Sequence, residues 1–382
     1  MPRVNRREIV PENQIGVFHC IQRCVRRAFL CGFDHATQKN FDHRKLWVQN
    51  RLRQLASLFG IDVCGYAVMS NHLHVILRTR PDVVAAWSNE EVAKRWWTLF
   101  TGYRDLDHET GPPSYQPTDK DLAPLLNEPG RLAELRKRLG SLSWFMRCLA
   151  EPIARRANGE DKCTGRFFEG RFKSQALLDA SAMLACSLYV DLNPVRAGLA
   201  ERAVEAPFTS AHDRHQDEAD ACAVGPTEQP ATEMAPAVAG TSPPTPTRSE
   251  WLAPLELREG NEVGEADRAQ RRAFGSARAS DRGCLPMKPR QYFGLLDWVI
   301  AERERRLRAS RSLEAAGAEM PEEYNALLSA LDAVPESWVE TVWQFGSRFR
   351  NAVGRTASLT AEAGRRGRRW LQGQREGTPA FR

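Results

Sequence analysis

Apolar and polar residues alternate in two parts of the N-terminal region, and a stretch with helical spacing separates them. Residues 16–25 alternate as a strand does, and one face of this strand is expected to carry Val17, His19, Ile21 and Arg23. From about Asp42 the apolar residues recur at helical spacing, and Gly60 is expected to end that helix. Residues 61–69 and 72–78 then predict a hairpin of two strands around a polar turn.

Further along the chain the pattern is mostly helical. Residues 82–101 and 132–158 have helical periodicity, whereas 102–130 is rich in Pro, Gly and Asp and is expected to be a loop. The whole of 81–140 is therefore interpreted as an insertion in the sheet-forming core. Residues 166–177 predict a further strand or extended arm.

A helix is predicted to begin at Asp179, a favourable N-cap residue, and to end before Pro194, because proline disfavours the helical conformation of the residue before it. Residues 206–250 are dominated by Ala, Pro, Thr and acidic residues. Such a segment buries too little apolar surface to offset the entropy lost on ordering, so a disordered linker is expected. Helical periodicity returns over 285–350, where the expected core residues are Trp298, Trp338, Trp343 and Phe345.

The elements together predict an α+β fold class. A chain of 382 residues is long enough for two domains, and we expect a folded region at 1–205, the linker at 206–250, a helical accessory domain at 251–350 and a basic tail at 351–382. No apolar run approaches the roughly 20 residues needed to cross a bilayer. The N-terminus also lacks the apolar stretch of a secretory signal, so a cytoplasmic location and no membrane partner are expected.

The net charge of +6 conceals an uneven distribution. Residues 1–60 hold 11 Lys and Arg against 4 Asp and Glu, and five arginines lie between 364 and 375, whereas 213–267 is rich in acidic residues. Basic ends of this kind favour a polyanionic partner such as nucleic acid. The alternative is that these arginines form ordinary solvated faces.

Nine cysteines are scattered along the chain, and none forms a Cys-x-x-Cys pair. Cys20, Cys24 and Cys31 have a spacing that a metal site could use, but a second cluster of ligands is missing from the sequence. Reduced and mostly buried thiols are therefore favoured over a zinc site.

The most distinctive local pattern is His72-Leu-His74 in the third predicted strand. Side chains alternate along a strand, so the two histidines share one face while Leu73, Val75 and Leu77 point into the core. Two imidazoles about 7 Å apart on one face can share a divalent metal ion if a third oxygen or nitrogen donor is near. Such a pair on an exposed strand face also occurs by chance, so the pair alone does not establish a metal site.

A second pattern lies at the end of the helix that precedes Pro194. Tyr189 and Asn193 are four residues apart and would present a phenol and an amide oxygen on one helix face. A phenol with its ordinary pKa of about 10 is a poor nucleophile, and a cation that polarises a target phosphate makes its attack feasible. The alternative is that Tyr189 is a core aromatic residue and Asn193-Pro194 merely stops the helix.

Four segments, taken in order, resemble a known family. They are Val17-Phe-His-Cys-Ile-Gln-Arg, Tyr66-Ala-Val-Met-Ser-Asn-His-Leu-His-Val, Gly165-Arg-Phe-Phe-Glu-Gly-Arg-Phe-Lys-Ser and Tyr189-Val-Asp-Leu-Asn-Pro-Val-Arg-Ala-Gly. The set resembles the IS200-like transposases, which combine a single tyrosine with a His-hydrophobe-His motif, and most strongly the branch associated with repetitive extragenic palindromes. The resemblance covers roughly residues 12–205, and the C-terminal half carries no motif of this family.

The resemblance implies a ferredoxin-like antiparallel sheet with flanking helices. It implies Mg²⁺ or Mn²⁺ held by His72, His74 and Asn193. Tyr189 would be the nucleophile that attacks single-stranded or hairpin DNA, leaving a 5′-phosphotyrosine link and a free 3′-OH. Such a protein would be associated with the nucleoid and would act as a monomer or homodimer. Many relatives have Gln as the third ligand, although the branch resembled here has Asn-Pro.

Candidate DNA contacts lie between 166 and 173. Arg166, Arg171 and Lys173 are interleaved there with Phe167, Phe168 and Phe172. Cations of this kind can follow phosphates while aromatic rings stack on unpaired bases. Further phosphate contacts are expected from Arg23, Arg26 and Arg27. The alternative for 166–173 is the edge of a core strand with solvated charges.

Two functions from different classes remain open. The first is a metal-dependent enzyme that nicks and rejoins DNA, and the second is a non-cleaving protein that binds DNA hairpins and descends from such an enzyme. A zinc hydrolase is less favoured, because no acidic residue lies near the His pair to serve as its partner.

Overall fold

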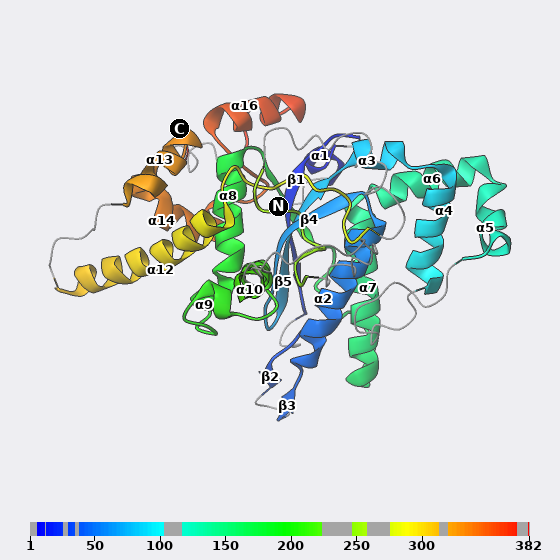
Figure 1. The fold of residues 1–382 in the computed structure, drawn as a ribbon, viewed down its shortest axis with the longest axis horizontal. Coiled ribbons are helices and arrows are strands. Elements are labelled where there is room, and N and C mark those ends of the chain that lie inside the picture. Colours follow the sequence, from blue (N-terminus) through cyan, green and yellow to red (C-terminus); the bar gives the residue numbers. More distant parts are fainter. Residues whose placement is uncertain are drawn as a thin grey trace, which may run out of the picture.

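The computed structural model of the protein describes residues 6–11, 13–25, 30–34, 38–102, 117–223, 247–257, 276–312, 320–372 and 381. Figure 1 shows the arrangement of its elements. In chain order these are α1 Arg6–Ile9, β1 Val17–Arg23, β2 Phe33–Asp34, β3 Lys39–Asn40, α2 His43–Leu58, β4 Ile61–Val68, β5 His72–Thr79, α3 Pro81–Ala86, α4 Asn89–Trp97, η1 Thr98–Gly102, α5 Asp119–Leu126, α6 Pro129–Leu139, α7 Leu142–Glu160, β6 Lys173–Leu177, α8 Ala180–Asp191, α9 Asn193–Arg196, η2 Ala203–Glu205, α10 Ser210–Ala223, α12 Pro289–Ser312, α13 Glu322–Ala330, α14 Pro335–Trp343, α15 Phe345–Arg348, β7 Ala352–Val353 and α16 Thr356–Arg365.

One five-stranded sheet, in the order β4-β5-β1-β6-β7, organises the molecule. The first four strands pair antiparallel, β4 with β5, β5 with β1, and β1 with β6. Along the chain these strands and the two long helices follow one another as β1, α2, β4, β5, α7 and β6. In the sheet, β5 lies between β1 and β4. This is the ferredoxin-like arrangement, and it confirms the expected fold class. The remaining strand, β7, adds to the edge in parallel with β6.

Helices α2 and α7 cover one face of the sheet. Leu73, Val75 and Leu77 of β5 lie in the core on that side, as the alternation predicts. Figure 1 shows α2 and α7 together on one side of the strands and α8 on the other. Six of the nine free cysteines are buried as well, which confirms the expected burial of most thiols.

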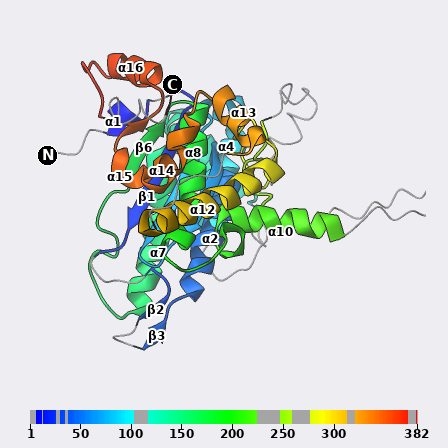
Figure 2. The same cartoon turned by 90° about the vertical axis from the view of Figure 1, so that its left-hand side faces the viewer.

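The opposite face of the sheet is covered by α8 and by C-terminal helices. Trp338 of α14 and Phe345 of α15 are fully buried in this second core, and Trp298 and Trp343 pack against it. Seen from that side, α12, α14 and α15 lie in front of the sheet (Figure 2). The region predicted as a helical accessory domain therefore shares a core with α8 and the sheet.

The expected linker at 206–250 is wrong for its first part. Helix α10 spans Ser210–Ala223 and belongs to the fold. Its buried polar residues have partners within the protein; Asp213, for example, accepts hydrogen bonds from the Tyr66 hydroxyl at 2.7 Å and from Gln49 at 3.1 Å. The composition of this segment suggested disorder because it has few apolar residues. Composition does not show that polar side chains can be buried when they form hydrogen bonds with one another. Residues 224–246 of the predicted linker lie outside the described residues.

Two other expectations also need correction. The loop predicted at 102–130 contains α5, whose buried Leu122 and Leu125 hold it on α4 and α6; residues 103–116 lie outside the described part. The predicted basic tail contains β7 and α16, so it belongs to the fold. Three of its basic side chains form ion pairs, Arg365 and Arg366 with Glu362, and Arg368 with Glu8. Arg375 lies outside the described residues. None of the described helices is long and apolar enough to cross a membrane.

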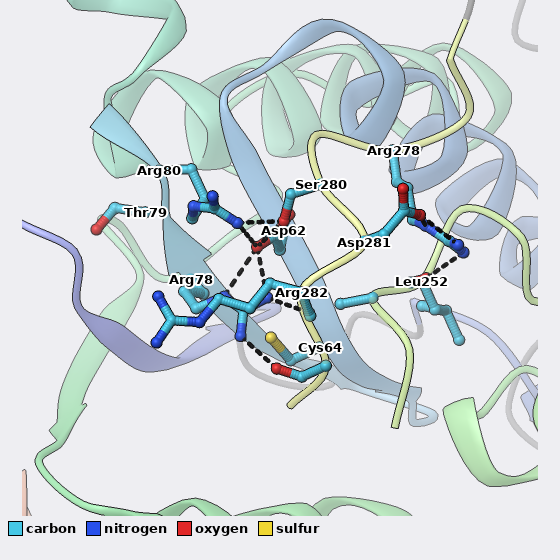
Figure 3. A network of polar contacts seen from close by, with 12 residues as sticks. Asp62, Cys64, Arg78, Thr79, Arg80, Leu252, Arg278, Ser280, Asp281 and Arg282 are labelled. Carbon is cyan, nitrogen blue, oxygen red and sulfur yellow. Dashed lines mark hydrogen bonds and ion pairs between the residues drawn. The ribbon is translucent and has the colours of Figure 1, made fainter. Parts of the chain in front are cut away.

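A buried polar network fixes the segment that precedes α12 onto the sheet (Figure 3). Arg78 on β5 lies opposite Asp62 on β4 and donates to its carboxylate at 2.8 Å. The same guanidinium donates to the carbonyl of Gly283 at 2.7 Å, and Ser280 donates to Asp62 at 2.8 Å. Because Asp62 and Arg78 are both buried, the carboxylate, the guanidinium and the 280–283 backbone depend on one another.

Removing Asp62 is expected to destabilise the protein strongly. Asp62→Ala leaves the buried charge of Arg78 without its counter-ion, which typically costs about 3–5 kcal/mol. Asp297→Ala is the matched control, because Asp297 pairs with Arg202 at an exposed site and such pairs contribute at most about 1 kcal/mol. Urea unfolding measures both variants, and equal small losses for the two would contradict this account.

Candidate functional site

The two histidines of the His72-Leu-His74 motif share one face of β5, as predicted. Their ring centroids are 4.8 Å apart and the rings meet edge to face, closer than the strand repeat alone would place them. That face is not exposed, however. His74 is only 2% exposed, because α8 and α15 cover the sheet there, while His72 at the start of β5 is partly buried.

A third histidine joins this pair from the neighbouring strand. His19 Nε2 lies 2.8 Å from His74 Nδ1, and the two rings stack with centroids 5.1 Å apart. On its other side, His19 Nδ1 lies 3.2 Å from Gln175 Oε1 of β6. The strand pattern placed His19 on a common face with Ile21 but did not identify it as a site residue. His19 contacts His74 because the register of β1 and β5 sets Ile21 opposite His74. The sequence does not reveal that register.

Burial keeps the three imidazoles neutral. It lowers the pKa of His19 to about 4, although the hydrogen bond with Gln175 acts in the opposite direction, and His72 adds to the lowering. The pKa of His72 is lowered to about 4 by burial, then by the charges of Arg23 and Arg196. Burial also lowers the pKa of His74, and repulsion of its charged form by the neighbouring His19, His72 and Arg196 lowers it further. Neutral imidazole is the form that binds metal ions, so the site is in its ligating form at neutral pH.

Tyr189 lies directly against these histidines. It sits near the end of α8, whose start is fixed by Asp179 accepting a hydrogen bond from the Ala182 amide at 3.0 Å. The Tyr189 ring meets His74 at 5.6 Å and His19 at 5.9 Å, both edge to face. The structure thus brings together the tyrosine and the His pair that the sequence placed more than 100 residues apart.

The other side of Tyr189 is covered by α15. Phe345 stacks on the Tyr189 ring with centroids 5.3 Å apart. A Cβ atom on Gly346 would lie 2.5 Å from the Tyr189 hydroxyl oxygen, so only a glycine lets the backbone approach this closely. Tyr189 is consequently only 7% exposed. Sequence analysis assigned Phe345 to the core but could not place it on the tyrosine.

Helix α8 ends at Asp191, before Pro194 as predicted. The expected reason is wrong, however, because Asn193 begins the short helix α9 with Pro194 in its first turn, so the proline does not move Asn193 out of the helical region. The Asn193 amide nitrogen donates to the carbonyl of Tyr189 at 3.0 Å, and its oxygen accepts from Arg196 at 3.3 Å. Arg196 also lies over the Tyr189 ring, with Cζ 4.7 Å from the centroid. Sequence analysis missed Arg196, although its spacing of three residues from Asn193 was visible.

The donor set of the His pair fits a divalent metal ion. His74 Nε2 is buried and has no hydrogen-bond partner among the described residues, so one nitrogen is available for a ligand. Within the described part of the chain no group of three or more His, Cys, Asp and Glu side chains could hold a metal, so a third donor would be of another kind. The amide oxygen of Asn193 is the expected one, and in this structure it accepts a hydrogen bond from Arg196.

The candidate DNA contacts gather near His72. Arg23 lies opposite His72 in the register of β1 and β5, and Lys173 lies opposite Ile21 at the start of β6. Arg23, Arg166, Arg171 and Lys173 are all exposed, and Arg23 lies 3.8 Å from Glu169.

The idea that the interleaved aromatics stack on bases is wrong for Phe167 and Phe172. Both are buried in the core under α2 and α7, because the chain at 167–169 hydrogen-bonds to Arg23 and Val25 and turns these rings inward. Phe168 is partly buried and packs against the same core. Arg26 and Arg27, also expected to contact phosphates, lie outside the described residues.

Comparisons with known proteins add little to the interpretation of this site. No protein-family model matches the sequence, and no curated protein matches it. One solved structure, a REP-associated tyrosine transposase bound to a REP hairpin, aligns with 60% of this chain and 93% of its own at 11% identity, with a TM-score of 0.30. A superposition this loose carries no inference about this chain.

The buried state of His19 predicts a pH dependence of stability. The folded protein holds His19 neutral down to about pH 4, whereas the unfolded chain protonates it near its ordinary pKa of 6.5. Its contribution is therefore complete above about pH 6.5 and is lost as the pH falls toward 4. The free energy of unfolding of the wild type minus that of His19→Leu should fall by roughly 3 kcal/mol over this range. Urea unfolding in EDTA tests this, and a difference that does not change with pH would refute it.

Proposed function

We propose that the protein cuts and rejoins single-stranded or hairpin DNA through Tyr189, with a divalent metal ion such as Mg²⁺ or Mn²⁺ at His72 and His74. The observation that carries this proposal is the contact of Tyr189 with buried, neutral histidines, its ring 5.6 Å from His74 and 5.9 Å from His19. A structural tyrosine gains nothing from the unpaired nitrogen atom of His74, whereas a nucleophile beside a potential metal ligand has a chemical use.

The reaction requires little beyond these groups. The Tyr189 oxygen attacks a backbone phosphorus, the bond from phosphorus to the 3′ oxygen breaks, and the phenol proton is released. The products are a 5′-phosphotyrosine and a free 3′-OH, and attack by a 3′-OH reverses the step without ATP. A divalent ion, when bound, polarises the phosphate and neutralises the charge that develops on it. Arg196 adds a positive charge over the Tyr189 ring.

The surface charge near the histidines suits a nucleic acid. Arg23, Arg166, Arg171 and Lys173 lie at the end of the sheet where His72 is located, so a phosphate backbone that follows them passes the His pair. We propose these four residues as phosphate contacts. The binding they provide would be insensitive to base sequence.

A second function is favoured by one observation. Tyr189 is only 7% exposed, with Phe345 stacked on it and Gly346 against its hydroxyl. A protein that binds DNA hairpins without cutting them needs no access to this tyrosine. The two functions make opposite predictions about a covalent product.

The covalent product is tested with Tyr189→Phe. The full-length protein is incubated with a labelled single-stranded hairpin and Mn²⁺, and adducts are resolved on a denaturing gel. We expect the wild type to form an adduct and Tyr189→Phe to form none while still binding the hairpin. Tyr324→Phe, which removes a hydroxyl from α13 at the far end of the second core, is the control and should leave the adduct intact. Binding by the wild type with no adduct would support the non-cleaving function.

The phosphate contacts are tested through salt dependence. Lys173→Ala should weaken hairpin binding and reduce the slope of log Kobs against log salt by about 1. Lys120→Ala removes the same charge from α5, away from the sheet, and should leave the slope unchanged. Fluorescence anisotropy across a salt series measures both slopes, and an equal effect of the two variants would argue against a phosphate track at the end of the sheet.

A further inference from the structure

Three buried side chains form a chain of hydrogen bonds across the sheet. Gln175 on β6 lies opposite His19 on β1, with 3.2 Å between Gln175 Oε1 and His19 Nδ1. His19 Nε2 in turn lies 2.8 Å from His74 Nδ1 on β5. All three residues are buried, so water does not compete for these bonds.

The direction of this chain is fixed at Gln175. Its Oε1 can only accept a hydrogen bond, so His19 must donate from Nδ1. Neutral His19 then has its lone pair on Nε2, which accepts from Nδ1–H of His74. His74 therefore carries its proton on Nδ1 and its lone pair on Nε2.

His72 is held in the same form by a separate contact. Its Nδ1 lies 2.7 Å from Asn71 Oδ1, which again can only accept. The lone pair of His72 is therefore on Nε2 as well. Both histidines of the pair therefore present Nε2 as an acceptor. His74 is oriented by His19 in the sheet, and His72 is oriented by Asn71 in the adjoining turn.

The unpaired Nε2 atom of His74 destabilises the folded protein. His74 Nε2 is buried and has no hydrogen-bond partner among the described residues. An unsatisfied buried polar atom typically costs about 1–3 kcal/mol. Twelve buried side-chain atoms of the described residues have no hydrogen-bond partner, and His74 Nε2 is the one that belongs to the His pair and lies on a ring in contact with Tyr189, so a ligand bound there would offset its cost.

We propose that Gln175 and His19 are positioning residues that hold His74 with Nε2 presented to a divalent cation. This inference rests on the proposed function and extends it to two residues that do not touch the cation or the DNA. In metal sites the ring nitrogen opposite the ligating one commonly donates to such a partner, which fixes the ring and raises its basicity. Loss of such a partner typically weakens metal binding by about 10–100-fold.

The first test measures Mn²⁺ binding to the full-length protein by calorimetry or by the loss of the free-ion EPR signal. Gln175→Met removes the acceptor and should weaken binding by about 10–100-fold. Gln175→Glu keeps an acceptor oxygen at this position and should restore most of the affinity. Gln22→Met is the matched control, since Gln22 is equally buried on β1 but bonds to the Gly170 carbonyl. Equal affinity in Gln175→Met and the wild type would overturn the proposal.

The second test does not need a metal ion or DNA. In the metal-free protein, nitrogen-15 NMR of the histidine rings should show His74 as the Nδ1–H tautomer, and Gln175→Met should reduce that preference. His74 protonated on Nε2 in the wild type would overturn the proposal, as would a wild type that binds no Mn²⁺. The proposed DNA cleavage fails separately, when the wild type forms no Tyr189 adduct, so the two failures are distinguishable.

Discussion

Two apolar cores lie against the opposite faces of one sheet, and this constraint decides where polar groups can be placed. Every residue of β4 is buried, and all but the first residue of β5 are buried too. A polar side chain on these strands must therefore find a partner within the protein or leave an atom unsatisfied. Asp62 and Arg78 satisfy one another and the 280–283 backbone, whereas His74 is satisfied at one nitrogen only.

The chemistry of the site follows from the same burial. Removing the imidazoles from water disfavours their charged forms, so the cluster is neutral at neutral pH. The positive charge near the tyrosine comes instead from Arg196, which contacts both the Tyr189 ring and Asn193. A divalent ion at the His pair would add to that charge.

The C-terminal region bears directly on access to Tyr189. Helix α15 puts Phe345 on the tyrosine ring, and β7 follows at once and pairs with β6, so the cover is tied to the sheet edge. In the proposed reaction, Phe345 and Gly346 would have to move aside for a DNA strand to reach the Tyr189 hydroxyl, and exposing a fully buried Phe side chain costs about 1.5–3 kcal/mol. The C-terminal half thereby covers a site whose proposed chemical groups all lie before residue 200.

The sequence by itself determined most elements before residue 200 and the face of β5 on which the His pair lies, but it did not predict α5, α10, β7 or α16. Alternation along β5 and the proline after α8 are consequences of local backbone geometry, so they could be deduced for His72, His74 and Tyr189 without a structure. Only the tertiary structure decided that His19 and Gln175 join His74, that Arg196 takes the Asn193 oxygen, and that Phe345 covers the tyrosine. These contacts depend on strand register and on packing between residues more than 50 positions apart, except for the local Arg196 bond. Local patterns carry no information about such distances, and that is why burial of the site, its neutrality and its cover could not be foreseen.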